Sequence, residues 1–314
     1  MYLFDLHCDT ITRLFSGERL APGDRSLRHS GAHLALDRMS GVRWAQCFAI
    51  FVPDDLRGCD AVDYFEDCYQ FFRDQMDENA DLIVQTRTAD EIEAALAAGK
   101  AAALLTVEGG AALGGDLSMA ARLAACGVRM LTLTWNGANE LAGGNAAGGG
   151  FTPFGGEAVG ELERLGIVAD VSHLSDRAFW ELAGFARRPF VASHSNARAV
   201  CPHPRNLTDE QFRRIAQGGG LVGINYCVRF LTEAGDPAFE DVAAHIDHFL
   251  DLGGEDTLAL GSDFDGADLP SWLSAGEKVR DFYPKVAARF GSARAEKLFF
   301  TNAIDFWRRY DGLR

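Results

Sequence analysis

The first ten residues of the chain end in an imidazole and a carboxylate spaced two residues apart, His7 and Asp9. The residues before them form a short apolar run that is typical of a buried strand. On a strand, residues i and i+2 point to the same face, so both side chains would project together and could share a divalent metal ion. Such a pair also occurs by chance, so a metal site requires further ligands from the rest of the chain.

Four more side chains of metal-ligating type stand just after other apolar runs: Glu108, His173, His194 and Asp263. Taken singly, each has an ordinary structural explanation, such as a hydrogen-bonded histidine or a carboxylate that caps the next segment. Taken together, they can meet only if the fold brings the ends of several strands to one place. Buried carboxylates at such a place would be costly without a shared cation.

The elements between these residues predict such a fold. Eight short apolar runs are mostly separated by helix-like stretches, which is typical of a (β/α)8 barrel of the TIM type with its strand ends at one mouth. We expect the strands within residues 1–10 and at 42–51, 101–107, 128–134, 167–171, 189–192, 221–226 and 257–261. An open doubly wound sheet is the alternative, but no phosphate-binding glycine fingerprint follows the first strand.

The chain shows neither a linker nor an internal repeat, so we expect one domain over residues 1–314 with helices at its C-terminal end. One loop, 135–156, is long and rich in glycine, and loops of that length inside a domain are usually functional or mobile.

The candidate ligands combine imidazole and carboxylate without thiolate, which suits zinc first and then manganese, iron or cobalt. Three imidazoles and three carboxylates are too many for one tetrahedral ion, so the set favours two ions about 3.5–4 Å apart. A two-metal site makes hydroxide at neutral pH and polarises a carbonyl, which is the chemistry of amide hydrolysis.

The overall composition limits the kinds of binding partner that we expect. The chain has 314 residues and a formal net charge of −15, and an acidic surface repels nucleic-acid phosphate and anionic lipid. Seven cysteines without a C-x-x-C pair predict reduced thiols, and neither a signal peptide nor an apolar run of membrane-spanning length is evident. We therefore expect a cytoplasmic protein that binds neither nucleic acid nor membrane.

Several motifs, in order along nearly the whole chain, resemble the membrane (renal) dipeptidases, the zinc dipeptidases of peptidase family M19. The motifs are Asp5-Leu6-His7-Cys8-Asp9-Thr10, Val107-Glu108-Gly109-Gly110, Leu131-Thr132-Leu133-Thr134, Thr152-Pro153-Phe154-Gly155, Asp170-Val171-Ser172-His173, Ser193-His194-Ser195, Pro204-Arg205-Asn206 and Gly261-Ser262-Asp263-Phe264-Asp265-Gly266. The resemblance implies a metallopeptidase with two Zn²⁺ ions. Members of this family are often homodimers, so a second copy of the chain is a partner that the resemblance allows.

The same resemblance implies roles for the candidate ligands. His7 and Asp9 bind one zinc ion. His173 and His194 bind the second ion, and Glu108 bridges the two.

It also implies a substrate site. Asp263 resembles the catalytic carboxylate of the family, which handles a proton and faces the substrate amine. Arg205 resembles the residue that holds the terminal carboxylate of the dipeptide, for which a guanidinium offers a bidentate fork. Tyr226, near the end of the seventh strand, lines the substrate pocket or belongs to the core.

One position departs from the family pattern. Many members carry a histidine directly after the Leu-Thr-Leu-Thr strand, where it helps to stabilise the tetrahedral intermediate, and here Trp135 and then Asn136 follow. The indole N–H or the amide of Asn136 could donate a hydrogen bond to substrate, but neither carries a positive charge. The other interpretation of Trp135 is a wall of the pocket.

Together these observations predict a metal-dependent dipeptidase that attacks the peptide carbonyl with a metal-bridging hydroxide, on substrates that include dipeptides with a D-residue at the C-terminal position. One alternative is another binuclear amidohydrolase, acting on a lactam, a cyclic amide or an N-acyl amino acid. Another is a metal-binding barrel with weak catalysis, because of Trp135.

Overall fold

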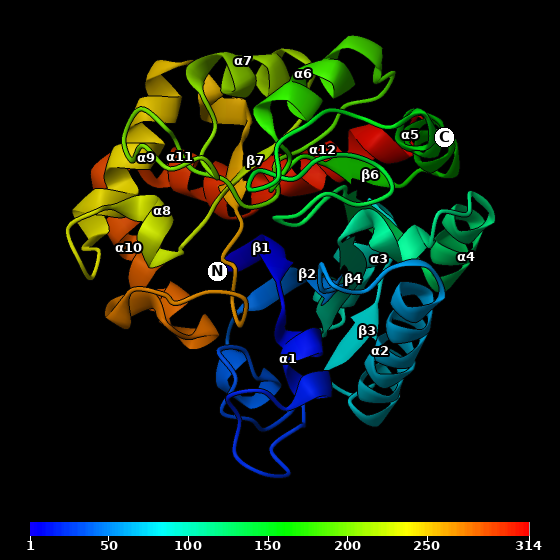
Figure 1. The fold of residues 1–314 in the computed structure, drawn as a ribbon. Coiled ribbons are helices and arrows are strands. Elements are labelled where there is room, and N and C mark those ends of the chain that lie inside the picture. Colours follow the sequence, from blue (N-terminus) through cyan, green and yellow to red (C-terminus); the bar gives the residue numbers. More distant parts are fainter. Residues whose placement is uncertain (314) are drawn as a thin grey trace.

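The computed structural model describes residues 1–313, which build an α/β fold around a curled sheet of parallel strands (Figure 1). The strands are β1 (Tyr2–Cys8), β2 (Arg43–Phe51), β3 (Ile83–Gln85), β4 (Ala101–Glu108), β5 (Val128–Thr132), β6 (Val168–Asp170), β7 (Val222–Ile224) and β8 (Leu258–Leu260). Their order is β6-β5-β4-β2-β1-β8-β7, and β3 pairs with β4 off this path. β1 therefore lies beside both β2 and β8, so the first and last strands of the chain are neighbours in the sheet.

The two open edges of this order, β6 and β7, are joined by the segment predicted as the sixth strand. It is too short to count as a strand, which corrects the prediction for 189–192. Val191 pairs with Asp170 at the end of β6, and Ala192 pairs with Val222 at the start of β7. Close packing at this point depends on Gly223, because a Cβ there would lie 1.9 Å from the carbonyl oxygen of Ser193. The ring closes, and the predicted TIM-type barrel is confirmed.

Helices follow most of the strands and cover the outside of the sheet (Figure 1). They are α1 (Thr10–Ser16), α2 (Gly58–Glu78), α3 (Ala89–Ala97), α4 (Ser118–Cys126), α5 (Pro153–Leu165), α6 (Asp176–Phe185), α7 (Asp209–Gln217), α8 (Val228–Leu231), α9 (Phe239–Asp251), α10 (Val279–Phe290), α11 (Ser292–Glu296) and α12 (Asn302–Asp311). Local capping sets several of their starts. Thr208 and Gln211 form a reciprocal capping box at α7, for example, and the Ser175 hydroxyl accepts from the Ala178 N–H at α6.

Two features differ from the expected elements. β3, which has three residues and pairs with β4 alone at the outside of the ring, was not predicted. Helices are present at the C-terminal end as expected, but a π-helical turn, Lys297–Thr301, separates α11 from α12. Asn302, just after this turn, donates to the carbonyl oxygens of Glu255 and Leu258, both at 2.8 Å, so the wide turn accompanies the anchoring of α12 to the start of β8.

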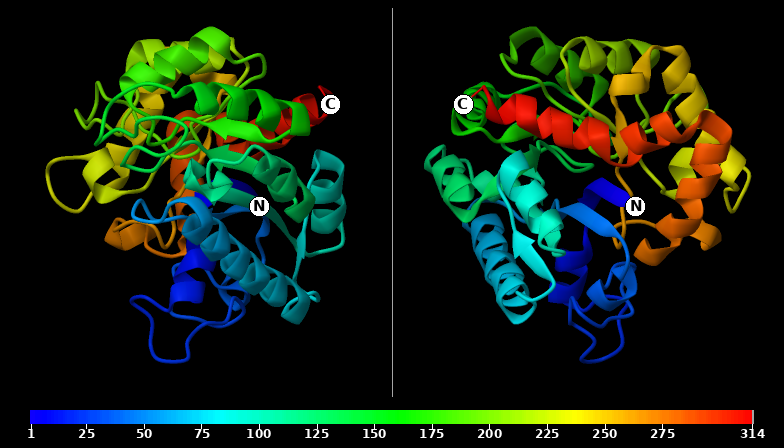
Figure 2. Two further views of the ribbon diagram at one scale, coloured as in Figure 1. Left: turned by 45° about the vertical axis from the view of Figure 1, so that its right-hand side comes forward. Right: turned by 180° about the vertical axis from the view of Figure 1, so that it is seen from behind.

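Helix α12 crosses the sheet at the N-terminal ends of the strands (Figure 2, right). Besides the bond from Asn302 to Leu258, the Tyr310 hydroxyl donates to the carbonyl oxygen of Ile167, just before β6. The end of the barrel where the strands begin is thus closed, and the end where they terminate carries the candidate ligands. Among residues 1–313, no helix combines the length and apolar character needed to cross a bilayer.

Candidate metal centre and active site

The strand ends bring all six predicted ligands to one mouth of the barrel, where they are buried. His7 lies in β1, Asp9 follows it, and Glu108 is the last residue of β4. The remaining three follow β6, the segment at 191–192 and β8, and they are His173, His194 and Asp263.

Glu108 stands at the centre of the group. One of its carboxylate oxygens, Oε1, lies 3.0 Å from Nε2 of His173 and 3.7 Å from Nε2 of His194. The other oxygen, Oε2, lies 3.5 Å from Nε2 of His7, which in turn is 3.3 Å from Oδ2 of Asp9. Each oxygen of this carboxylate thus faces a different set of imidazole nitrogens, as expected of a carboxylate between two ions.

Two groups of side chains place their ligand atoms within 4.8 Å of one another, His7 with Glu108 and His194, and His7 with Asp9 and Asp263. His7 therefore belongs to both groups, and its ring stacks on that of His194 with centroids 3.9 Å apart.

The donor set fits divalent cations. Oδ1 of Asp9 is buried and has no hydrogen-bond partner among the described residues. The Nε2 atoms of His173 and His194 face each other at 3.1 Å, a distance at which two lone pairs repel unless a proton or a cation lies between them. Imidazole and carboxylate without thiolate are the ligands that zinc and its neighbours share.

Burial and mutual repulsion shift the ionisation of the group. Burial, and then the charge of Asp9, raise the pKa of Glu108 to about 7. Burial alone would lower the pKa of His7, but the Asp9 and Glu108 carboxylates outweigh it and raise that pKa well above its usual value. Burial lowers the pKa of His173 and His194 well below the usual value, so both imidazoles are neutral, as ligands must be.

The backbone is also unusual here. Within residues 1–313, four residues other than glycine have a positive φ, and three of them stand at these strand ends: His173 at 69°, Asp263 at 63° and Asp265 at 69°. Such conformations cost about 1–3 kcal/mol each and cluster at functional sites.

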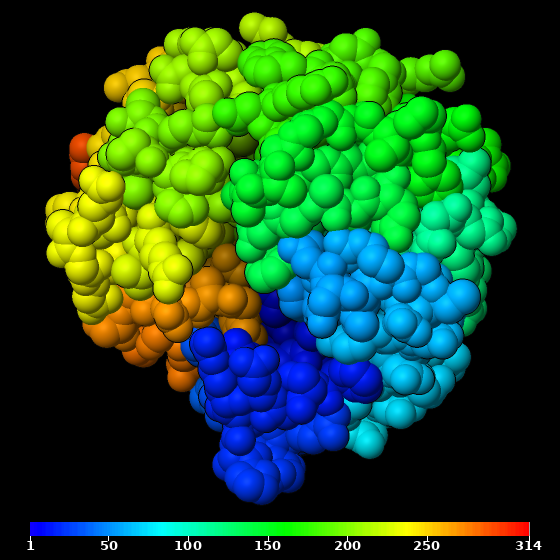
Figure 3. Space-filling model, in the orientation of Figure 1, coloured from blue at the N-terminus to red at the C-terminus, as the bar shows by residue number. Residues whose placement is uncertain are grey.

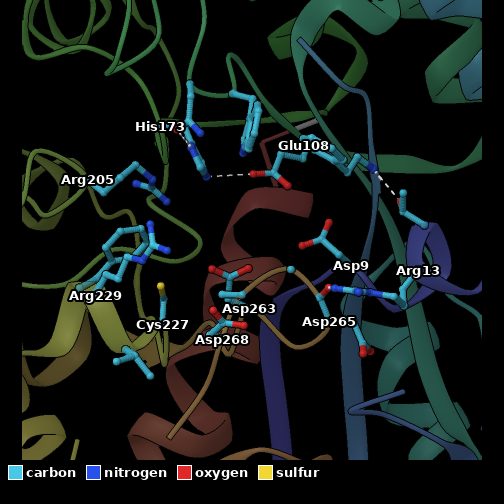
Figure 4. Close-up of a pocket in the computed structure, with 18 of the residues that line it drawn as sticks. Asp9, Arg13, Glu108, His173, Arg205, Cys227, Arg229, Asp263, Asp265 and Asp268 are labelled. Atoms are coloured by element: carbon cyan, nitrogen blue, oxygen red, sulfur yellow. Dashed lines mark hydrogen bonds and ion pairs between the residues drawn. The ribbon is translucent and has the colours of Figure 1, made fainter. Parts of the chain in front are cut away.

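The ligands open onto a cavity of about 810 Å³. Figure 3 shows a hollow where the N-terminal segment (dark blue), the middle of the chain (green) and the segment after β8 (orange) meet. In the close-up of Figure 4, Arg205 and Arg229 lie on one side of the cavity, and Asp9 and Asp263 lie on another.

Arg205 is buried in the cavity wall, with its guanidinium only partly satisfied. Nη2 donates to the carbonyl oxygen of His194 at 3.2 Å and Nη1 to Oγ of Ser195 at 3.4 Å. Its Nε is buried without a partner in the described structure, and the guanidinium lies 5.3 Å from the ring centre of Phe230. These donors are placed to receive an anionic group.

Asp263 lines the same cavity, and the side-chain amide of Asn225 donates to its Oδ2 at 3.0 Å. Burial raises the pKa of Asp263, which favours a carboxyl group able to exchange a proton.

Trp135 and Asn136 both line the cavity. The indole ring of Trp135 packs edge-on against Phe51, with ring centroids 5.0 Å apart, as a pocket wall would. Oδ1 of Asn136 lies 3.0 Å from Nδ1 of His173, so this amide oxygen serves a candidate ligand. The glycine-rich loop that follows is tied to the same histidine, because the Asn145 N–H donates to the carbonyl oxygen of His173 at 2.7 Å.

Tyr226 lies elsewhere. Its ring is 1% exposed and packs edge-on against Phe264 and Phe282, and it is not among the described side chains that line the cavity. The prediction of a pocket position for Tyr226 is therefore corrected in favour of its core alternative.

Three residues that contribute to the site were not predicted from the sequence. Asn225 contacts Asp263, and Asp170 and Ser193 lie behind His194. Asn225 directly follows β7, so the rule that strand ends carry the site could have indicated it. For Asp170 and Ser193 only the closeness of other candidate ligands in the sequence was available as a signal.

Comparisons with known proteins agree with this geometry. Residues 1–313 match the family model for membrane dipeptidase (peptidase family M19). The fold is similar to that of the dipeptidase AC, a metallopeptidase of family M19, with a TM-score of 0.92, 30% identity and 98% of both chains covered. It is equally similar to a metallopeptidase from Rhodobacter sphaeroides liganded with a phosphinate mimic of the dipeptide L-Ala-D-Ala, with a TM-score of 0.92, 29% identity, and 98% of this chain and 99% of that one covered.

Relatives known from their sequences match in part. Dipeptidase tcpJ of Claviceps purpurea is 32% identical over 249 residues, which cover 75% of this chain and 57% of that protein. A Klebsiella pneumoniae protein from the pqqA 5′ region is 43% identical over 161 residues, which cover 48% of this chain and 59% of that protein. The chain thus spans less than two thirds of the length of these curated relatives.

Proposed function

The chain belongs to the membrane dipeptidase family, peptidase family M19, and from this premise we propose that it hydrolyses the peptide bond of dipeptides with two bound zinc ions. The observation that carries the proposal is the position of Glu108, whose two carboxylate oxygens face three imidazoles, His7 on one side and His173 and His194 on the other. The R. sphaeroides relative carries a mimic of L-Ala-D-Ala, which supports substrates with a D-residue at the C-terminal position.

The proposed division of ligands follows the distances. His7 and Asp9 would hold one ion, His173 and His194 the other, and Glu108 would bridge them. Manganese, cobalt or iron suit the same donors. Bound at this site, the ions supply hydroxide at neutral pH and polarise the carbonyl to be attacked.

Side chains of the cavity wall would orient the substrate and move the proton. Arg205 binds the terminal carboxylate of the dipeptide through its unfilled donors, which favours dipeptides over longer chains. Asp263, held by Asn225, accepts a proton from the nucleophile and passes it to the leaving amine. Trp135 and Asn136 form part of the cavity wall around the scissile bond.

The compartment, the domain organisation and the oligomeric state are also part of the proposal. All seven cysteines are free and six are buried, which supports the cytoplasm as its compartment. The pairing of β1 with β8 supports one domain over residues 1–314. A homodimer remains a prediction from the family resemblance.

The test is hydrolysis of a panel of L,L- and L,D-dipeptides by the purified protein, with metal content measured before and after chelation. We expect two zinc ions per chain, loss of activity on chelation, and recovery on adding zinc. The panel includes lactams and N-acyl amino acids. Turnover of these without turnover of dipeptides would favour the other amidohydrolases, and two bound ions without any turnover would favour the silent metal-binding barrel.

A further inference from the structure

A buried group of polar side chains lies behind His194. Oδ2 of Asp170 accepts from the hydroxyls of Ser193 and Thr132, both at 2.6 Å. Oδ1 of the same carboxylate accepts from the backbone N–H groups of Ser172 at 3.0 Å and Ser193 at 2.9 Å. Asp170 and Ser193 are both fully buried, so no water competes for these bonds.

These contacts determine the direction of the next hydrogen bond. A carboxylate oxygen accepts about two hydrogen bonds, so four donors fill Asp170 and leave no position for a proton on it. The Ser193 hydroxyl has one hydrogen, and it is donated to Asp170. Its remaining hydrogen-bond neighbours are Oγ of Ser172 at 3.3 Å and Nδ1 of His194 at 2.7 Å, and from both of these Oγ of Ser193 can only accept.

The consequence reaches the metal centre. If Nδ1 of His194 carries the hydrogen, its Nε2 presents a bare lone pair, and this is the nitrogen that lies 3.7 Å from Glu108 and 3.1 Å from Nε2 of His173. A histidine ligand is generally fixed in this way by a hydrogen bond from its other ring nitrogen. His173 has a comparable partner, since the amide oxygen of Asn136 lies 3.0 Å from its Nδ1.

We propose that Ser193, oriented by Asp170, is a positioning residue that holds His194 with its hydrogen on Nδ1 and its Nε2 lone pair toward the metal centre. The effect on metal binding rests on the proposed function, whereas the position of the hydrogen is a property of the chain itself. Ser193 touches neither substrate nor metal in this assignment and acts only through His194.

Thr132 offers a matched control. Its hydroxyl donates to the same carboxylate oxygen as that of Ser193, at the same distance, but within residues 1–313 it makes no hydrogen bond to a candidate ligand. Ser193→Ala and Thr132→Val each remove one hydroxyl from Asp170, so a purely structural role of the network would affect both variants alike. Only Ser193→Ala removes the acceptor for Nδ1 of His194.

The first measurement is zinc affinity by competition with a chromophoric chelator, with thermal unfolding of the metal-free proteins alongside. We expect Ser193→Ala to lose about 10–100-fold in affinity for one ion per chain, the usual effect of removing such a partner. Thr132→Val should stay within about threefold of the unchanged protein, because the partner of His194 is retained. Equal affinities in all three proteins would overturn the proposal, and so would equal losses in both variants.

The second measurement reads the hydrogen directly, by ¹⁵N NMR of the metal-free, unchanged protein labelled at histidine. We expect the resonances of His194 to show a protonated Nδ1 and a bare Nε2, and the hydrogen that separates the facing Nε2 atoms in the absence of a cation then belongs to His173. A hydrogen on Nε2 would overturn the proposal even if Ser193→Ala failed to fold. Failure of the unchanged protein to bind zinc would instead contradict the proposed function, and the NMR result would still decide the role of Ser193.

Discussion

Replacing Arg205 with methionine should abolish recognition of the terminal carboxylate of the substrate without affecting the chemical step. The guanidinium is held by two long hydrogen bonds, at 3.2 and 3.4 Å, and its Nε is buried without a partner within residues 1–313. A carboxylate bound by this fork would gain charge-assisted hydrogen bonds of about 1.5–3 kcal/mol each. Taking about 3 kcal/mol for the pair, the variant should lose about 150-fold in kcat/KM, mostly through KM.

The assay separates this role from a structural one by changing the substrate as well as the enzyme. A dipeptide and its C-terminal amide differ only in the carboxylate, so we expect the unchanged enzyme to prefer the free dipeptide by about 100-fold. In Arg205→Met this preference should vanish, and kcat/KM for the amide should be nearly unaffected. Arg229→Met is the control, because Arg229 is an exposed arginine on the same cavity and a solvated ion pair contributes at most about 1 kcal/mol.

Two results would refute this reasoning. If Arg205→Met lost the same factor on the free and the amidated dipeptide, the residue would support the wall of the cavity through His194 and Ser195 and would not bind the carboxylate. If Arg229→Met instead erased the preference, the carboxylate would lie on the other arginine.

Three further predictions concern the proton, the family departure and the response to acid. Asp263→Asn should lower kcat by about 10²–10⁴-fold while both zinc ions stay bound; unchanged kcat with full zinc content would exclude its role in proton transfer. Trp135→His should raise kcat about tenfold by adding a donor that can carry charge, and a lower kcat with intact folding would show that the indole itself contributes. His245 is buried, accepts from the Ala197 N–H at 3.1 Å and lies 3.0 Å from the carbonyl oxygen of Leu231, and burial lowers its pKa to about 4. The unfolded chain takes up a proton below about pH 6.5 that the folded protein refuses, so the free energy of unfolding should fall by about 3 kcal/mol between pH 6.5 and 4. In urea unfolding, the free energy of unfolding of His245→Gln should fall by about 3 kcal/mol less over this pH range than that of the unchanged protein. If both proteins lose the same free energy of unfolding, His245 is not the origin of the acid sensitivity.

The barrel and the meeting of the candidate ligands at its mouth could be predicted because both depend on local sequence patterns. Buried parallel strands are apolar on both faces, so they appear as continuous runs, and the residue after each run lies at the mouth of the barrel. Glu108 is placed by that rule, and His173 lies one residue beyond the position that it gives. The segment at 189–192 was predicted as a strand on the same grounds, yet only Val191 and Ala192 pair with their neighbours.

The lack of apolar–polar alternation in buried strands also explains where the prediction failed. The run 221–226, which contains β7, is apolar apart from Asn225 and does not alternate, so apolar character alone does not show which of its last residues faces the mouth. A shift of one residue exchanges the two faces of a strand. Asn225 faces Asp263 and Tyr226 faces the core, the reverse of the expected pocket position. The contact between Ser193 and Asp170 depends on the pairing of neighbouring strands, which no local pattern encodes.

The polarity of the cavity bears on the choice between a dipeptide and an uncharged cyclic amide. Arg205 and Arg229 lie on one side of the cavity and Asp9 and Asp263 on another, whereas Arg13 donates to the backbone carbonyl oxygen of Asp265 (Figure 4). A zwitterionic dipeptide has the same polarity, since its carboxylate suits the arginine side and its ammonium group the side of Asp263. A dipeptide bound in that direction would have its peptide bond between the two charges, in the cavity that Glu108 also lines. A neutral lactam would leave Arg205 unpaired and gain nothing from Asp263. The charges of the cavity therefore favour the dipeptide, even though Trp135 lacks the positive charge that a histidine at its position could carry.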